Sequence, residues 1–197
     1  MTVSIPSVLV VDENKIRAAI IEAGLLEAGY DQVHVIGETL GLARYIEQIS
    51  PDVIVIDLEN PNRDLLESMF QLSRSVKRPI AMFVDQSDKT SIEAAVEAGV
   101  SAYIVDGLTK ERVKPILDMA ISRFNAFARM SLELQEARDE LAGRRMIDDA
   151  KAILMKAKNI SETEAYRLLR KTAMNQNRKI ADIAQSLVTA DNLMNEK

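Results

Sequence analysis

The chain has 197 residues, a formal net charge of −5 at neutral pH, no cysteine and a single histidine. The lack of cysteine excludes a disulfide framework, thiol catalysis and cysteine-ligated zinc, and one histidine leaves little for a histidine-based metal site or catalytic triad. No run of about 18 apolar residues occurs, so we expect a cytoplasmic protein that does not cross a membrane. The length suits one domain of about 120 residues and a smaller second domain.

Charge is distributed unevenly along the chain. Residues 1–120 contain 11 Lys and Arg against 19 Asp and Glu, a net of −8, whereas residues 121–197 contain 14 against 11, a net of +3. Within residues 144–179 the counts are 10 basic and 4 acidic, a net of +6. An acidic half followed by a concentrated basic segment indicates one part that senses or docks and another that meets a polyanion.

Five short apolar runs alternate with helix-like segments in the first 120 residues. The runs cover residues 8–11, 33–36, 53–56, 80–84 and 102–105, and the helix-like segments cover 15–28, 41–48, 65–75 and 90–98. Because the runs are apolar on both faces, they predict a parallel sheet covered on both sides by helices. We therefore expect an α/β fold over residues 1–120, with a doubly wound, five-stranded parallel sheet of the flavodoxin-like type. Thr90 and Glu93 predict a capping box at the start of the last of these helices.

From Lys110 onward no strand pattern returns, and residues 121–143 are predicted to form a long linker helix. A short seam of apolar residues at heptad spacing follows it, consisting of Phe127, Met130, Leu134, Ala137 and Leu141. Two heptads are fewer than a coiled coil usually needs. Two readings therefore stay open: an amphipathic helix that lies on its own domain, or a coiled coil with a second copy of the chain.

Residues 144–197 predict three short helices packed together. Apolar residues recur at helical spacing in three segments, at positions 147, 150, 154 and 157, then 165, 168, 169 and 172, then 180, 183, 184 and 187. Ser161 and Glu164 predict a capping box at the start of the second helix. The core of such a bundle is thin.

Three carboxylates are expected at one edge of the predicted sheet. Asp12 and Glu13 end the first strand and Asp57 ends the third, and in a doubly wound sheet the ligand site lies outside the carboxyl ends of the strands. Carboxylates without a neighbouring histidine or cysteine suit magnesium, and one of them could act as a phosphoryl-accepting nucleophile. The alternative is that these residues only cap the helices that follow them.

Together with Pro61 and the stretch Ala98–Tyr103, these carboxylates make residues 7–120 resemble the response-regulator receiver family. The resemblance implies phosphotransfer from a histidine kinase to Asp57, with magnesium held by Asp12, Glu13 and Asp57. Receivers differ from this chain at the ends of two strands. They have Ser or Thr where it has Val84, and Lys where it has Asp106.

Both differences weaken the expectation of phosphorylation. Val84 offers no hydroxyl to a phosphoryl oxygen, and Asp106 replaces an attraction by a repulsion of a few kcal/mol at an effective dielectric near 20 and about 4 Å. Lys110 could compensate if its loop folds back. We therefore favour a receiver used as a protein-docking platform over one controlled by phosphorylation of Asp57.

Ten basic residues are candidates for contact with nucleic acid. Arg144, Lys151 and Lys158 are seven apart and would share one face of the first helix of the module. The full set is Arg144, Arg145, Lys151, Lys156, Lys158, Arg167, Arg170, Lys171, Arg178 and Lys179. These side chains would hold phosphates. The alternative is a basic helical face that only meets solvent.

Residues 136–192 resemble the ANTAR family of RNA-binding antitermination domains. The matching stretches are residues 145–155, 164–170 and 179–184, with Ala152 where the family has glycine. The resemblance implies binding to paired short hairpins in the leader of a nascent transcript, which blocks an overlapping terminator. A homodimer on the RNA is one way to engage two hairpins.

Residues 82–88 and 102–108 resemble the nitrate- and nitrite-responsive antiterminators of the NasT type. This resemblance implies control by a nitrate- or nitrite-sensing regulatory protein in nitrate assimilation. We expect no required cofactor, with magnesium as an optional ligand of the receiver. Two other classes stay open. A phosphorylation-controlled DNA-binding response regulator would need a helix-turn-helix, and residues 174–180 lack the expected glycine. A magnesium-dependent phosphatase would need a general acid, and none is evident, so we expect no enzyme.

Overall fold

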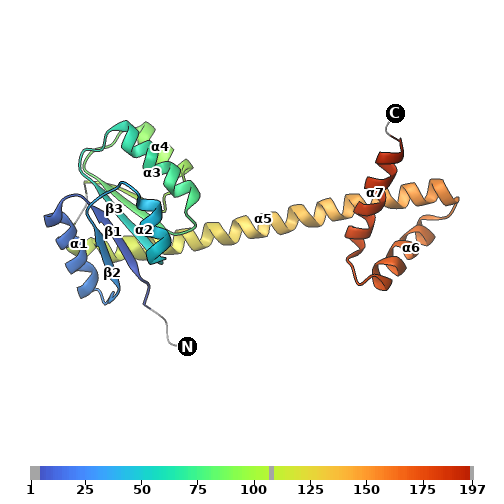
Figure 1. Ribbon diagram of the computed structural model, residues 1–197, viewed down its shortest axis with the longest axis horizontal. Coiled ribbons are helices and arrows are strands. Elements are labelled where there is room, and N and C mark those ends of the chain that lie inside the picture. Colours follow the sequence, from blue (N-terminus) through green and yellow to red (C-terminus); the bar gives the residue numbers. More distant parts are fainter. Residues whose placement is uncertain (1–4, 107–108, 196–197) are drawn as a thin grey trace. The chain divides into compact units, whose positions relative to one another are not determined.

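The computed structural model describes residues 5–106 and 109–195 (Figure 1). It divides into two units, Met1–Ala128 and Arg129–Lys197. Residues 121–143, expected to form a linker or coiled-coil helix, are part of one long helix, α5 (Lys110–Lys158). Within the described residues, no helix is both long enough and apolar enough to span a membrane.

The N-terminal unit contains the predicted five-stranded parallel sheet. Its strands are β1 (Val8–Asp12), β2 (Val33–Ile36), β3 (Val53–Leu58), β4 (Ile80–Val84) and β5 (Ala102–Val105), in the order β2-β1-β3-β4-β5. Every residue of β1, β3 and β4 is buried, as expected for central strands with a helix layer on each face. The α/β fold class is therefore confirmed.

Helices cover both faces of this sheet. The helices between the strands are α1 (Lys15–Glu27), α2 (Leu42–Ile49), α3 (Arg63–Ser75) and α4 (Lys89–Glu97). One core cluster joins the sheet to α2, α3 and α4, and a second joins the other face to α1 and the first turns of α5. Figure 1 shows α3 and α4 together on one side of the sheet. The carboxyl ends of the strands stay open between the layers.

The N-caps of α1 and α4 position the loops that follow β1 and β4. Asn14 caps α1 by accepting from the backbone N–H groups of Ile16 and Arg17, so the turn after β1 is short and fixed. The capping box expected from Thr90 and Glu93 was wrong, because Asp88 caps α4 and accepts from the N–H of Ser91. The N-cap of α4 therefore lies two residues earlier than the sequence pattern indicated.

The C-terminal unit is the predicted set of three packed helices. The end of α5 packs with α6 (Glu162–Asn175) and α7 (Ile180–Asn195) around Ala150, Leu169 and Ala184. The capping box of Ser161 and Glu164 is confirmed, with both of its hydrogen bonds present. Small residues at the centre of this core let the three helices approach closely.

Candidate functional site

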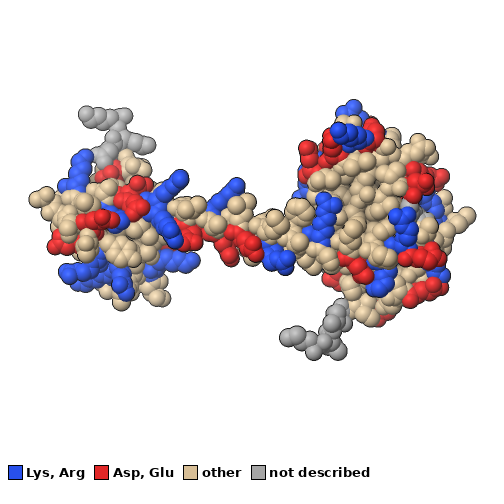
Figure 2. Space-filling model, turned by 180° about the vertical axis from the view of Figure 1, so that it is seen from behind, with Lys and Arg blue, Asp and Glu red and all other residues tan. Residues whose placement is uncertain are grey.

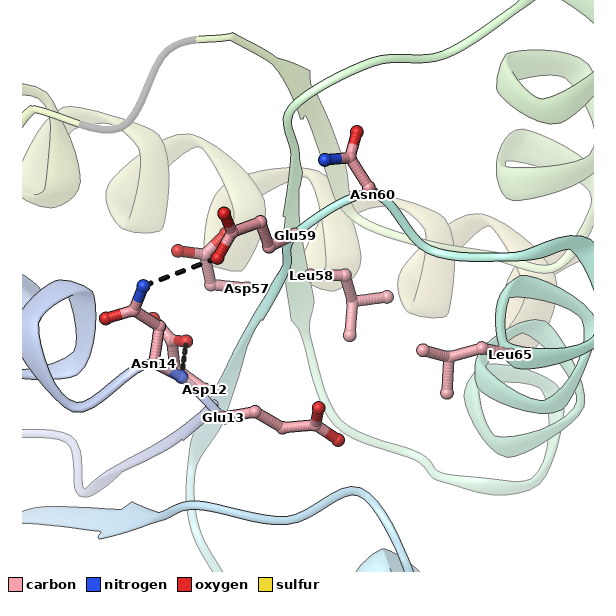
Figure 3. Close-up of a pocket in the computed structure, with 8 residues that line it drawn as sticks. All are labelled: Asp12, Glu13, Asn14, Asp57, Leu58, Glu59, Asn60 and Leu65. Atoms are coloured by element: carbon pink, nitrogen blue, oxygen red, sulfur yellow. Dashed lines mark hydrogen bonds between the residues drawn. The ribbon is translucent and has the colours of Figure 1, made fainter.

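Asp12 and Asp57 lie side by side at the carboxyl ends of adjacent strands. The register of β1 and β3 pairs them directly, and both residues are buried, at 4% and 2% exposed. A cavity of about 590 Å³ opens beside them, lined also by Glu13, Asn14 and residues 58–60 and 65 (Figure 3). The sequence prediction thus placed these two carboxylates at the correct edge of the sheet.

Arg17, which the sequence analysis did not single out, fills the space between the strand ends. Its Nε donates to Asp57 Oδ2 at 2.8 Å and its Nη2 donates to Asp57 Oδ1, so both oxygens of this carboxylate are taken. Its Nη1 donates to the two oxygens of Asp85, just after β4, at 3.0 and 3.2 Å. Because it binds two carboxylates through charge-assisted hydrogen bonds, this guanidinium is the main positive group of the site.

The electrostatics of the site favour a charged Arg17. Burial lowers the pKa of Arg17, but hydrogen bonds and charge from Asp57 and Asp85 outweigh it and raise the pKa above its ordinary value. Burial also raises the pKa of Asp12 to about 6, with the charge of Asp57 adding to the rise and the N–H of Asn14 opposing it. Asp12 therefore resists ionisation in this site.

The carboxylates do not fit a magnesium ion as they are placed. In favour of a fit, Asp12 Oδ2 is buried and accepts no hydrogen bond from the described residues. Against it, both oxygens of Asp57 are bound by Arg17, and Glu13 is exposed, extends away from Asp57 (Figure 3) and accepts from Thr39 at 3.3 Å. Among residues 5–106 and 109–195, no group of three His, Asp or Glu side chains could hold a metal ion.

The two departures from the receiver pattern lie at the carboxyl ends of β4 and β5. Val84 is buried at the end of β4, and Asp106 follows β5 with a φ of 45°. Lys110 pairs with Glu27, so the structure does not bring its ammonium to Asp57. The hydroxyls of Ser87 and Tyr103 lie 3.0 Å apart, which links the loop after β4 to β5.

The basic surface of the C-terminal unit keeps most of its predicted members. Figure 2 shows Lys and Arg side chains over much of the lower part of this unit. All ten predicted side chains except Lys151 are exposed. Arg144 pairs with Glu140 at 2.6 Å, and Arg178 donates to Ser186 Oγ at 3.2 Å, while both stay on the surface.

Lys151 takes a different place from the one its spacing suggested. Its side chain is only 16% exposed, and its Nζ lies 2.7 Å from Asp148 and 2.6 Å from Glu162. The pair with Glu162 joins α5 to the first turn of α6. Lys151 therefore serves the packing of the module more than it serves an open phosphate-binding face.

The turn between α6 and α7 also differs from the expectation. Residues 174–180 lack glycine, but Asn177 adopts a φ of 50°, the left-handed conformation that glycine would otherwise supply. The missing glycine is therefore no argument against a helix-turn-helix. The affinities of the chain for duplex DNA and for RNA therefore distinguish the two alternatives.

Comparison with known proteins agrees with this two-part organisation. The response regulator receiver domain matches residues 8–118, and the ANTAR domain matches residues 135–188. The chain belongs to the response regulators that carry a receiver and an ANTAR domain.

Similar proteins of this family are regulators. The chain is 25% identical over 174 residues to the transcriptional regulatory protein PdtaR of Mycobacterium tuberculosis, which covers 88% of this chain and 84% of PdtaR. It is 30% identical over 84 residues to the nitrate regulatory protein of Klebsiella oxytoca, covering 43% of this chain and 21% of that protein. A solved response regulator from Thermotoga maritima matches with a TM-score of 0.53 at 20% identity, over 60% of this chain and 99% of that chain, which shows the fold alone.

Proposed function

We propose that this receiver–ANTAR regulator is a transcription antiterminator whose C-terminal unit binds hairpins in leader RNA. The observation that carries the proposal is the exposed basic surface on a module that matches the ANTAR domain. Arginine and lysine side chains on solvated helices neutralise phosphates without a large apolar interface. Binding of a leader hairpin that overlaps a terminator would favour transcription through it.

The contact surface is centred on α6. Arg167, Arg170 and Lys171 are exposed there, and Tyr166 is 44% exposed beside them. Arginine and tyrosine can both stack on unpaired bases, which is how proteins often read RNA loops. Lys156, Lys158, Arg144, Arg145, Arg178 and Lys179 add positive charge from α5 and from the start of α7.

A second copy of the chain would give the regulator two RNA-binding units. The seam on α5 leaves Met130, Leu134 and Leu141 at 62%, 52% and 59% exposed. In the heptad that places Leu134 at position a, Glu133 occupies g and Arg138 occupies e. Such a g and e pair, five residues apart, meets across the interface of a parallel two-stranded coiled coil. We propose a parallel homodimer along this helix.

We propose that a partner protein controls RNA binding by this regulator. Val84, Asp106 and the pairing of Asp57 with Arg17 all disfavour a phosphorylation switch, while the receiver surface stays available for docking. The similarity to a nitrate regulatory protein supports a nitrate- or nitrite-sensing partner. Release from that partner would free the basic module for RNA in the cytoplasm.

The direct test is a titration of the full chain with a labelled two-hairpin leader RNA and with duplex DNA of the same sequence. We expect the RNA to bind at least tenfold more tightly, with an affinity that falls steeply as salt rises. Arg167→Ala with Arg170→Ala should weaken RNA binding and reduce the salt slope by about 2, since each lost phosphate contact removes about 1. Tighter binding to the duplex would favour the DNA-binding alternative.

A further inference from the structure

Arg17, in the first turn of α1, joins the carboxyl ends of β3 and β4 through one guanidinium. Its side chain is 19% exposed, and its ion pairs reach Asp57 near the end of β3 and Asp85 just after β4. We propose that Arg17 is a built-in counter-cation that occupies the acidic pocket and excludes a divalent cation from Asp57. This inference deepens the proposal that Asp57 is not the control point, and it does not depend on RNA binding.

The geometry at Asp57 is that of a closed pair. Nε and Nη2 of Arg17 bind one carboxylate oxygen each, and the Asp57 side chain is fully buried beneath them. The planar guanidinium matches a carboxylate in this two-point arrangement, which a lysine cannot do. Metal binding or phosphoryl attack by either oxygen would have to compete with these hydrogen bonds and with the guanidinium charge.

The remaining nitrogen of the guanidinium holds it in place. Nη1 binds both oxygens of Asp85 and lies 4.0 Å from Glu59 Oε2. Glu59 also accepts from Asn14 Nδ2 at 3.3 Å, so the residue that caps α1 supports the same cluster. Any displacement of Arg17 would therefore break its contacts to the carboxyl ends of both β3 and β4.

The local charge explains why a cation is needed here. Asp12, Asp57 and Asp85 converge at this edge, and Asp106 stands where the family has lysine. Buried carboxylates require a nearby positive partner. Arg17 supplies that charge from within the chain, so the pocket needs no metal ion for its stability.

Binding of Mn²⁺, measured by electron paramagnetic resonance on the full chain, tests this proposal. Arg17→Gln should bind Mn²⁺ at least tenfold more tightly than wild type, and its melting temperature should rise on addition of Mg²⁺. Lys15→Gln removes the same charge from an exposed position on the same helical turn and should behave as wild type. An Arg17→Gln variant with unchanged Mn²⁺ affinity would overturn the proposal.

A second measurement decides the question if Arg17→Gln does not fold. Wild type and Asp57→Asn should then bind Mn²⁺ equally weakly, because Arg17 already excludes the ion from Asp57. A wild-type affinity that Asp57→Asn lowers tenfold or more would show that the ion displaces Arg17, and would refute the inference. RNA binding enters neither readout, so failure of the antitermination proposal would be seen separately.

Discussion

At the scale of single residues, the carboxyl of Asp12 has a raised pKa. Its folded-state pKa is about 6 against an ordinary value of 3.8, so the fold prefers the protonated form. The corresponding stability is fully present below about pH 4 and is lost as the pH rises through 6. A shift of this size corresponds to at most about 3 kcal/mol.

Asp12→Asn should therefore stabilise the N-terminal unit, and more at pH 8 than at pH 4. The amide of asparagine has nearly the same shape as the carboxylate of Asp12, and it removes the buried negative charge that repels Asp57. Urea unfolding of wild type and variant in the presence of a chelator, at both pH values, measures the difference. An equal gain at the two pH values would show that ionisation of Asp12 is not its cause.

Asp57 gives a second residue-scale prediction. Because Arg17 binds both of its oxygens, acetyl phosphate with Mg²⁺ should change RNA affinity by less than about fivefold, below the usual range of allosteric coupling. Fluorescence anisotropy with leader RNA, before and after treatment, provides the readout. A large donor-dependent increase that Asp57→Asn abolishes would restore control by phosphorylation.

At the scale of helices and strands, the seam of α5 makes a prediction about charge. Glu133→Arg or Arg138→Glu alone should weaken the parallel homodimer, because each places like charges opposite one another, by roughly 0.5 kcal/mol per pair. The double exchange should restore dimerisation, since the opposite charges meet again. Sedimentation equilibrium of the four proteins measures this, and a double variant as weak as the single ones would exclude the parallel register.

Local patterns predicted the elements better than they predicted the site. The apolar runs gave all five strands, and Ser161 with Glu164 gave the start of α6, because these signals depend on neighbours in sequence. Arg17 was not singled out, and Lys151 was expected on a solvated face, because both lie at helical positions that a single sequence reads as solvated. Their burial depends on partners that the fold brings together, 40 residues away for Asp57 and 11 for Glu162.

Asp88 shows a smaller failure of the same local reasoning. Thr90 and Glu93 have the spacing of a capping box, yet Asp88 offers a side-chain oxygen two residues earlier and accepts from the N–H of Ser91. Several residues able to cap a helix stood in this loop. The backbone path after β4 decided between them.

At the scale of the whole molecule, the proposal couples partner binding to RNA binding. If a nitrate-sensing partner prefers the RNA-free regulator, RNA must weaken partner binding by the same factor by which the partner weakens RNA binding. Titration calorimetry in both orders tests this equality, with and without nitrate. A complex that nitrate does not affect, or RNA affinity that excess partner leaves unchanged, would exclude sequestration.

The most direct test of the central claim is crosslinking of the full chain to RNA in cells, followed by sequencing of the bound RNA. The account predicts enrichment of paired hairpins that overlap terminators in transcript leaders, lost in the variant Arg167→Ala with Arg170→Ala. The matched receiver variant, Lys89→Ala with Arg112→Ala at exposed positions, should retain it. No enrichment of leader RNA, or equal recovery from the two variants, would contradict RNA binding through the basic surface of the C-terminal unit.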